Sequence, residues 1–125
     1  MSNLESRIQA LEDIEAIKRL KYDYLFFSDH KQPEKMRDCF APGAISIDYG
    51  RIGTFNSRDE LVAVFEQLAC AEHIIEMHHA QNPRVDLLGN NKAQGVFGLY
   101  YFMIDANQQT VTQLGGYYED VFEKI

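Results

Sequence analysis

The stretch that decides the fold is residues 93–125, AQGVFGLYYFMIDANQQTVTQLGGYYEDVFEKI. It contains two runs rich in β-branched and aromatic residues, Ala93–Ile104 and Thr110–Ile125, separated by the turn-forming residues 105–108. Two consecutive strands of this length, joined by a short loop, are typical of an antiparallel sheet that is long enough to curve. The glycine pair at 115–116 predicts a bulge where the last strand bends.

Two more strands are predicted just before this stretch, at His73–Ala80 and Arg84–Leu88, with Gln81-Asn82-Pro83 as their separator. Upstream of them the pattern is helical. The first 28 residues repeat apolar side chains every three or four positions, and Ser2 with Glu5 forms a capping box.

A short helix is predicted to begin at Pro33, followed by a short hairpin from Ala44 to Phe55. Ser57 and Glu60 then open a third helix, to about Ala71, with a buried stripe of Leu61, Val64, Phe65 and Leu68. This order predicts an α+β fold in which about three helices cover one face of a cone-shaped, curved antiparallel sheet.

The composition limits what the chain can be. A chain of 125 residues and 14.4 kDa is one domain, residues 1–125. The formal net charge of −7 disfavours binding to nucleic acid or to an anionic membrane. No apolar run approaches the roughly 20 residues of a membrane span, and no signal peptide is visible. We therefore expect a cytoplasmic protein in which Cys39 and Cys70 are buried, reduced thiols.

Two adjacent histidines are the first candidates for chemistry. His78 and His79 lie in a predicted strand, so their side chains point to opposite faces and one of them can face the interior of the cone. The plainer interpretation is that both imidazoles are exposed. A metal site built from His73, His78 and His79 is disfavoured, because the adjacent pair cannot converge and no further carboxylate or cysteine stands at a useful spacing.

Tyr24 and Asp29 close the first helix. They are five residues apart, about 140° around an ideal helix, so they share a site only if the helix ends before Asp29. The polar residues 28–32 ahead of Pro33 predict that end. Asp29 could instead be a loop or capping carboxylate, and Tyr24 a core aromatic. The many tyrosines in the segments that wall the cone suit a flat, partly polar organic ligand.

An ordered set of motifs resembles the SnoaL-like proteins of the nuclear-transport-factor-two-like superfamily, in the branch of scytalone dehydratase and bile-acid 7-alpha-dehydratase. The motifs are residues 11–20 (LEDIEAIKRL) with Tyr24 and Asp29, residues 40–44 (FAPGA), residues 57–60 (SRDE), residues 77–83 (MHHAQNP), and Gly116-x-Tyr118-x-Asp120. The resemblance covers the chain from about residue 8 onward. The family's final strand carries a tryptophan, whereas this chain has none and stops at Ile125, so we expect one domain that lacks that strand, naturally or by truncation.

The resemblance implies roles for individual residues. Asp29 matches the family's aspartate, His78 its strand histidine and Tyr24 a tyrosine of the first helix, as a catalytic set that needs no cofactor and no metal. Tyr101 stands where the bile-acid enzyme has a second acid. The residues expected to contact substrate are Tyr49, Tyr101, Asp48, Tyr118 and Phe97, with Asp48 and Tyr49 as alternatives for one family tyrosine.

The leading hypothesis is a cofactor-independent lyase or isomerase, dehydratase-like, that acts on a small hydrophobic cyclic ketone or alcohol of the polyketide, aromatic or steroid kind. His78 and Asp29 would carry the acid–base chemistry. The alternative is a non-catalytic module that binds a small ligand or assembles with other chains on the same fold. In either case we expect a homodimer or homotrimer, because one sheet face carries apolar residues that the helices leave uncovered.

Overall fold

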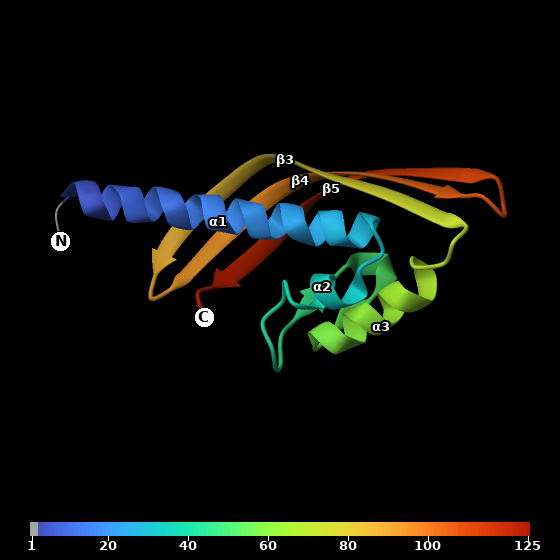
Figure 1. The fold of residues 1–125 in the computed structure, drawn as a ribbon, viewed down its shortest axis with the longest axis horizontal. Helices are drawn as coiled ribbons and strands as arrows, with labels where there is room; N and C mark the ends of the chain where they lie inside the picture. Colours follow the sequence, from blue (N-terminus) through green and yellow to red (C-terminus); the bar gives the residue numbers. More distant parts are fainter. Residues whose placement is uncertain (1–2) are drawn as a thin grey trace.

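The computed structural model describes residues 3–125, in which helices pack on one side of a curved three-stranded antiparallel sheet (Figure 1). The strand order in this sheet is β3-β4-β5, and β1 pairs with β2 in a separate small hairpin. The α+β architecture predicted from the sequence is confirmed. In chain order the elements are α1 Asn3–Asp29, α2 Pro33–Arg37, β1 Ile47–Asp48, the 3-10 helix Gly50–Ile52, β2 Thr54–Phe55, α3 Arg58–Leu68, β3 Ile74–Gly89, β4 Lys92–Asp105 and β5 Thr110–Glu123.

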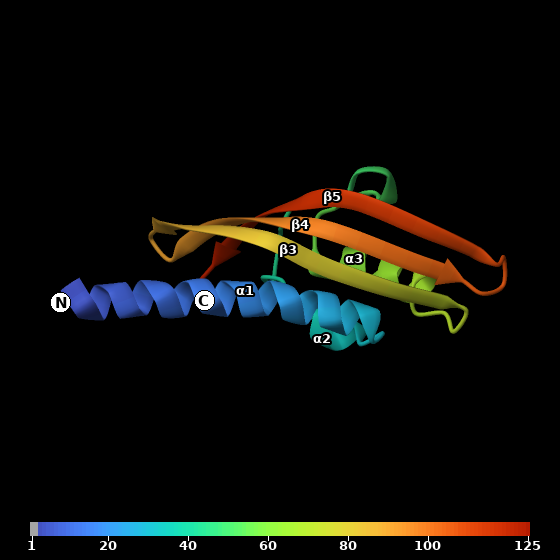
Figure 2. The same ribbon diagram turned by 90° about the horizontal axis from the view of Figure 1, so that it is seen from above.

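Helix α1 runs close to the edge strand β3 (Figure 2), and its buried residues all lie in its second half, at Lys21, Tyr24, Leu25 and Ser28. The first turns extend past the β3–β4 hairpin (Figure 1), so the predicted apolar stripe is exposed there, at Leu4, Ile8 and Leu11. The predicted capping box involves Ser2, which lies outside the described residues. The prediction that the helix ends before Asp29 is wrong, because Asp29 is its last residue.

Strand β3 replaces the two strands predicted between His73 and Leu88. Residues 81–84 do not separate them but form an irregularity in one continuous strand, where Gln81 pairs with Gly98 and Arg84 with Val96. Asn82 adopts a left-handed conformation there (φ 51°). The bulge predicted at residues 115–116 is absent, since β5 pairs with β4 without a shift. The proline and the left-handed asparagine disturb the ladder more than two glycines in extended backbone do.

The small hairpin and α3 close the lower side of the cone. The Ser57 side chain caps α3 by accepting a hydrogen bond from the Glu60 backbone, as predicted. The predicted buried stripe is wrong at one end, because Leu68 is 61% exposed and Val62 is buried instead. Helix α3 packs on α2 and β2. Its contacts with α1 and α2 form a core around Tyr24, Leu25, Met36 and Val62.

Candidate active site

The C-terminus of α1 meets the edge strand of the sheet through Asp29 and His78. His78 Nδ1 lies 2.7 Å from Asp29 Oδ1, and the His78 backbone N–H donates to both carboxylate oxygens, at 3.1 and 3.0 Å. The His78 side chain is 14% exposed and the Asp29 side chain is 18% exposed. Because the carboxylate accepts the proton on Nδ1, Nε2 of the neutral ring is left as the basic nitrogen.

Local sequence explains why Asp29 stands at this position. Lys31 has a left-handed conformation (φ 56°), and the backbone N–H of Gln32 returns to the Phe27 carbonyl at 2.9 Å. The chain therefore leaves the helix directly after Asp29, and Pro33 starts the next helix. The carboxylate is held at the helix end, where it accepts a backbone hydrogen bond from the edge strand β3.

Strand alternation separates the two histidines as predicted. His78 faces the helices, whereas His79 is exposed at the edge of the sheet. Tyr101 is the direct cross-strand partner of His78, and the two ring centroids are 4.7 Å apart. The Tyr101 hydroxyl donates a hydrogen bond to Glu76 Oε2. Glu76 was not among the predicted residues, although its place two positions before His78 puts it on the same face of the strand.

Three predicted tyrosines meet farther inside the cone. The Tyr24 and Tyr49 hydroxyls are 2.9 Å apart, and the Tyr49 and Tyr118 ring centroids are 6.1 Å apart. Burial raises the pKa of Tyr49 to about 12 and raises the pKa of Tyr24 and of Tyr118 well above the ordinary value. Carboxylates at Asp120, Glu76 and Asp29 add to the effect on Tyr118. All three phenols therefore keep their protons near neutral pH and can donate hydrogen bonds.

A buried ion pair supports this tyrosine cluster and was also missed from the sequence. Lys21 Nζ lies 2.8 Å from Asp120 Oδ2, and the Lys21 side chain is only 6% exposed. The ammonium group stands 3.4 Å from the ring centroid of Tyr118 and 5.1 Å from that of Tyr24. Desolvation lowers the pKa of Lys21, and the charge of Asp120 opposes that shift. The signal in the sequence was the position of Lys21, one helical turn before Tyr24, which places this lysine on the buried side of α1 and predicts a buried partner for its charge.

Two residues predicted to contact substrate, Asp48 and Phe97, make contacts that support the fold instead. Asp48 is exposed, and its carboxylate accepts a hydrogen bond from the Gly50 backbone at 2.9 Å. Of the two alternatives, the structure thus brings Tyr49 and not Asp48 to Tyr24. Phe97 is 0% exposed and packs edge-to-face against Tyr22 and Phe122, so it has no free surface for a ligand.

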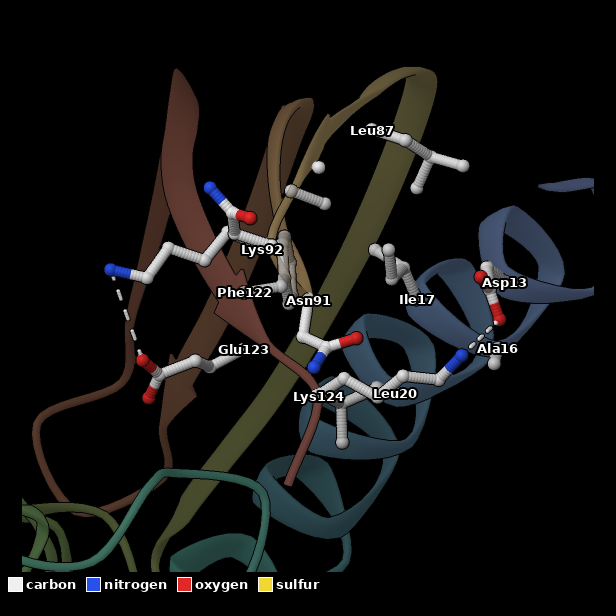
Figure 3. A pocket seen from close by; sticks show the side chains of 13 residues that line it. Asp13, Ala16, Ile17, Leu20, Leu87, Asn91, Lys92, Phe122, Glu123 and Lys124 are labelled. Atoms are coloured by element: carbon white, nitrogen blue, oxygen red, sulfur yellow. Dashed lines mark hydrogen bonds and ion pairs between the residues drawn. The ribbon is translucent and has the colours of Figure 1, made fainter.

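A groove of about 270 Å³ reaches the Asp29–His78 pair between α1 and β3. Besides the pair it is lined by Tyr22, Leu25, Phe26, His79 and Ala80, so polar and apolar side chains share its wall. A larger groove of about 420 Å³ lies near the β3–β4 hairpin, where Leu87, Ile17, Leu20 and Phe122 are among the residues that line it (Figure 3). Lys124 bonds Asp13 across it at 2.8 Å. None of the predicted site residues lines this larger groove.

Other kinds of site have less support within residues 3–125. No group of three or more histidine, cysteine or acidic side chains in this range is arranged to hold a metal ion. Burial and nearby aspartates raise the pKa of Cys39 to about 11, and burial also raises the pKa of Cys70. Both thiols therefore stay protonated and are poor nucleophiles. None of the helices in this range is long and apolar enough to cross a membrane.

Comparison with protein families matches residues 9–125 to the SnoaL-like domain. The chain belongs to the SnoaL-like domain family. Solved structures support the same fold for this SnoaL-like protein. A candidate scytalone dehydratase from Novosphingobium aromaticivorans DSM 12444 superposes with a TM-score of 0.83 at 20% identity, over 93% of this chain and 76% of that one. The hexachlorocyclohexane dehydrochlorinase LinA-type3 from Novosphingobium barchaimii LL02 has a TM-score of 0.82 at 16% identity, over 95% and 81%.

Proposed function

We propose that this SnoaL-like protein is a cofactor-independent lyase or isomerase that acts on a small, partly hydrophobic cyclic ketone or alcohol. Polyketide-, aromatic- and steroid-like compounds are the expected kinds. The observation that carries the proposal is the 2.7 Å contact between His78 Nδ1 and Asp29 Oδ1 in a mostly buried setting. It orients the imidazole and leaves Nε2 to act as a base.

The chemistry follows from the groups around this pair. His78 Nε2 removes a proton from the carbon next to a carbonyl, and Asp29 stabilises the imidazolium that forms. The phenols of Tyr24, Tyr49 and Tyr118 lie farther inside the cone than the groove, and they would supply donors for the enolate oxygen of a ligand that extends from the groove toward them. Return of the proton to another carbon gives isomerisation, and loss of a leaving group gives elimination. The names dehydratase and dehydrochlorinase of two similar structures favour elimination.

The groove beside the pair suits a small ligand with flat apolar faces. Tyr22 and Phe26 of α1 stand on one side and Ala80 of β3 on the other. A volume of about 270 Å³ lies near the lower end of small-molecule sites, so the expected ligand has one or two rings. Neither histidine nor carboxylate chemistry of this kind requires a metal or an organic cofactor.

The proposal is tested by proton exchange in D₂O. The protein, in the presence of a chelator and without added cofactor, is incubated with 2-tetralone and with 3-hydroxycyclohexanone. We expect loss of the α-proton signals in NMR to be faster than in buffer, and 3-hydroxycyclohexanone to give the unsaturated ketone. Rates equal to those in buffer for both ketones would contradict a role in carbonyl chemistry.

Tyr49→Phe should lower the exchange rate by about 10- to 100-fold. The change removes one of two hydroxyls that bond each other, so either the terminal donor or the group that polarises it is lost. The measurement is the α-proton exchange rate of 2-tetralone. Tyr117→Phe is the matched control, because Tyr117 is 79% exposed on the other face of the sheet. Equal rates for Tyr49→Phe and wild type would remove Tyr49 from the site.

Assembly with further copies of the chain is a second candidate function, compatible with the first. The face of the sheet turned away from the helices exposes apolar side chains from three strands, namely Ile75, Met77, Tyr100, Tyr117 and Val121. An exposed apolar face of this kind favours a homodimer or homotrimer. Light scattering should give a dimer or trimer mass for the wild type and a lower mass for Met77→Glu, whereas a monomeric wild type would contradict assembly.

A further inference from the structure

Glu76 and Tyr101 form a second pair of proton-exchanging groups beside the base. Glu76 and His78 are two residues apart on β3, so both face the helices. Tyr101 lies directly opposite His78 on β4, with ring centroids 4.7 Å apart, and its hydroxyl donates to Glu76. Any group bound against the His78 ring therefore also comes within reach of Tyr101.

The hydrogen-bond count limits what Tyr101 can do. A phenol has a single proton, and here that proton is donated to Glu76 Oε2. While Glu76 is ionised, the Tyr101 oxygen can only accept a hydrogen bond from a ligand. It then cannot stabilise an enolate oxygen, a task that the phenols around Tyr24 can perform. The partner suited to Tyr101 in this state is a hydroxyl group of the ligand. When Glu76 carries a proton and donates it to the Tyr101 oxygen, the phenol proton becomes available to that same hydroxyl.

We propose that Glu76 and Tyr101 together are the leaving-group acid of a dehydratase reaction on a β-hydroxy ketone. The inference rests on the proposed function and names its substrate class. In it, Tyr101 contacts the departing hydroxyl, and Glu76 supplies the proton through Tyr101. His78, on the same face of the sheet, removes the proton from the carbon between the carbonyl and the hydroxyl-bearing carbon.

The step balances without any further reactant. The C–H bond breaks, its proton goes to His78 Nε2, and its electron pair forms the new C=C bond conjugated with the carbonyl. The C–O bond breaks as the leaving oxygen takes the Tyr101 proton, and Tyr101 takes the proton of protonated Glu76. The products are the unsaturated ketone and water. Afterwards His78 holds one extra proton and Glu76 lacks one, so a transfer between them through solvent restores the site.

The surroundings of the pair favour proton transfer over ionisation of the phenol. Burial raises the pKa of Tyr101 well above its ordinary value, and the negative charges of Glu76 and Asp29 act in the same direction. The charge of Glu76 in turn acts on Tyr118 of β5 and on Cys70 after α3, where Lys31 acts in the opposite direction, and the His78 ring lies against Tyr101. Lys31 is bonded to the Ala71 carbonyl at 2.6 Å.

The dependence on the leaving group tests the inference. The probes are 3-hydroxycyclohexanone, which loses water and needs a proton, and 3-acetoxycyclohexanone, which loses acetate and needs none. Glu76→Gln and Tyr101→Phe should each slow the elimination of water by about 100-fold or more, and that of acetate by less than about 3-fold. Glu72→Gln, an exposed carboxylate just before β3, is the control.

The outcomes separate this inference from the proposed function. Equal losses with both leaving groups would mean that Glu76 only supports the structure, and would overturn the inference. Exchange of α-protons without elimination from either ketone would also overturn it, while leaving His78 as the base of an isomerase. No exchange and no elimination in the wild type would reject the proposed function itself, and the inference with it.

Discussion

Replacing His78 by alanine should lower the enzyme-dependent rates of α-proton exchange and of elimination by about 100- to 10,000-fold. The variant loses the only group of the Asp29–His78 pair that can present a basic nitrogen to a bound ketone. Folding should be little affected, because the His78 backbone N–H still donates to Asp29. The measurement is the exchange rate of 2-tetralone, together with the thermal midpoint of unfolding.

The chain offers a matched control at another histidine. His73→Ala removes an identical ring just before β3, at a residue that lines neither groove, and should leave the rates within about twofold of wild type. Asp29→Asn should retain an acceptor for the strand while losing the charge that stabilises the imidazolium. The same change costs about 10⁴-fold in an analogous Asp–His pair. Similar rates for His78→Ala and His73→Ala would end the assignment of His78 as the base.

Replacing Lys21 by methionine should lower the free energy of unfolding by about 2–4 kcal/mol. Methionine is close to lysine in length, so the main loss is electrostatic. Asp120, whose side chain is 27% exposed, would lose the cation that lies 2.8 Å away in the wild type. The Tyr118 ring would also lose the ammonium group 3.4 Å above it. Urea denaturation followed by circular dichroism measures the effect.

Two further variants separate charge from packing. Lys18→Met, on the same helix but with an exposed ion pair to Glu15, should change the free energy of unfolding by no more than about 1 kcal/mol. The double variant Lys21→Met/Asp120→Asn removes both charges and should recover part of the stability lost in Lys21→Met. If the double variant were no more stable than Lys21→Met, the loss would have to come from packing rather than from the unpaired carboxylate.

Much of the site could be predicted because it depends on local periodicity. Period-two alternation in β3 decides that His78 and His79 face opposite ways, and the structure confirms it. The end of α1 follows from Pro33 and the polar residues before it, to within one position at Asp29. The family resemblance named Asp29, His78 and Tyr24 before any coordinates, and the first two lie in contact.

Other features depend on partners far away in the chain and were missed. Lys21 resembles an ordinary charged helix residue until Asp120, about one hundred positions later, is brought against it. Glu76 resembles a solvated strand carboxylate until β4 places Tyr101 opposite the same face. Similarly, only the fold of the small hairpin decides between Asp48 and Tyr49. The Tyr49 hydroxyl reaches Tyr24, whereas the Asp48 carboxylate accepts a hydrogen bond from the Gly50 backbone.

By itself the sequence determined the order of helices and strands, apart from the two strands predicted where β3 is one, and the opposite faces of His78 and His79. These features depend on the hydrophobic period and on turn residues, which act within a few positions of the chain. Tertiary structure alone decided where β3 is irregular, how far along α1 the sheet reaches, and which charges and phenols are neighbours. The physical reason is that these contacts join segments 25 to about 100 residues apart, and burial changes a side chain's chemistry only once its partners are in place.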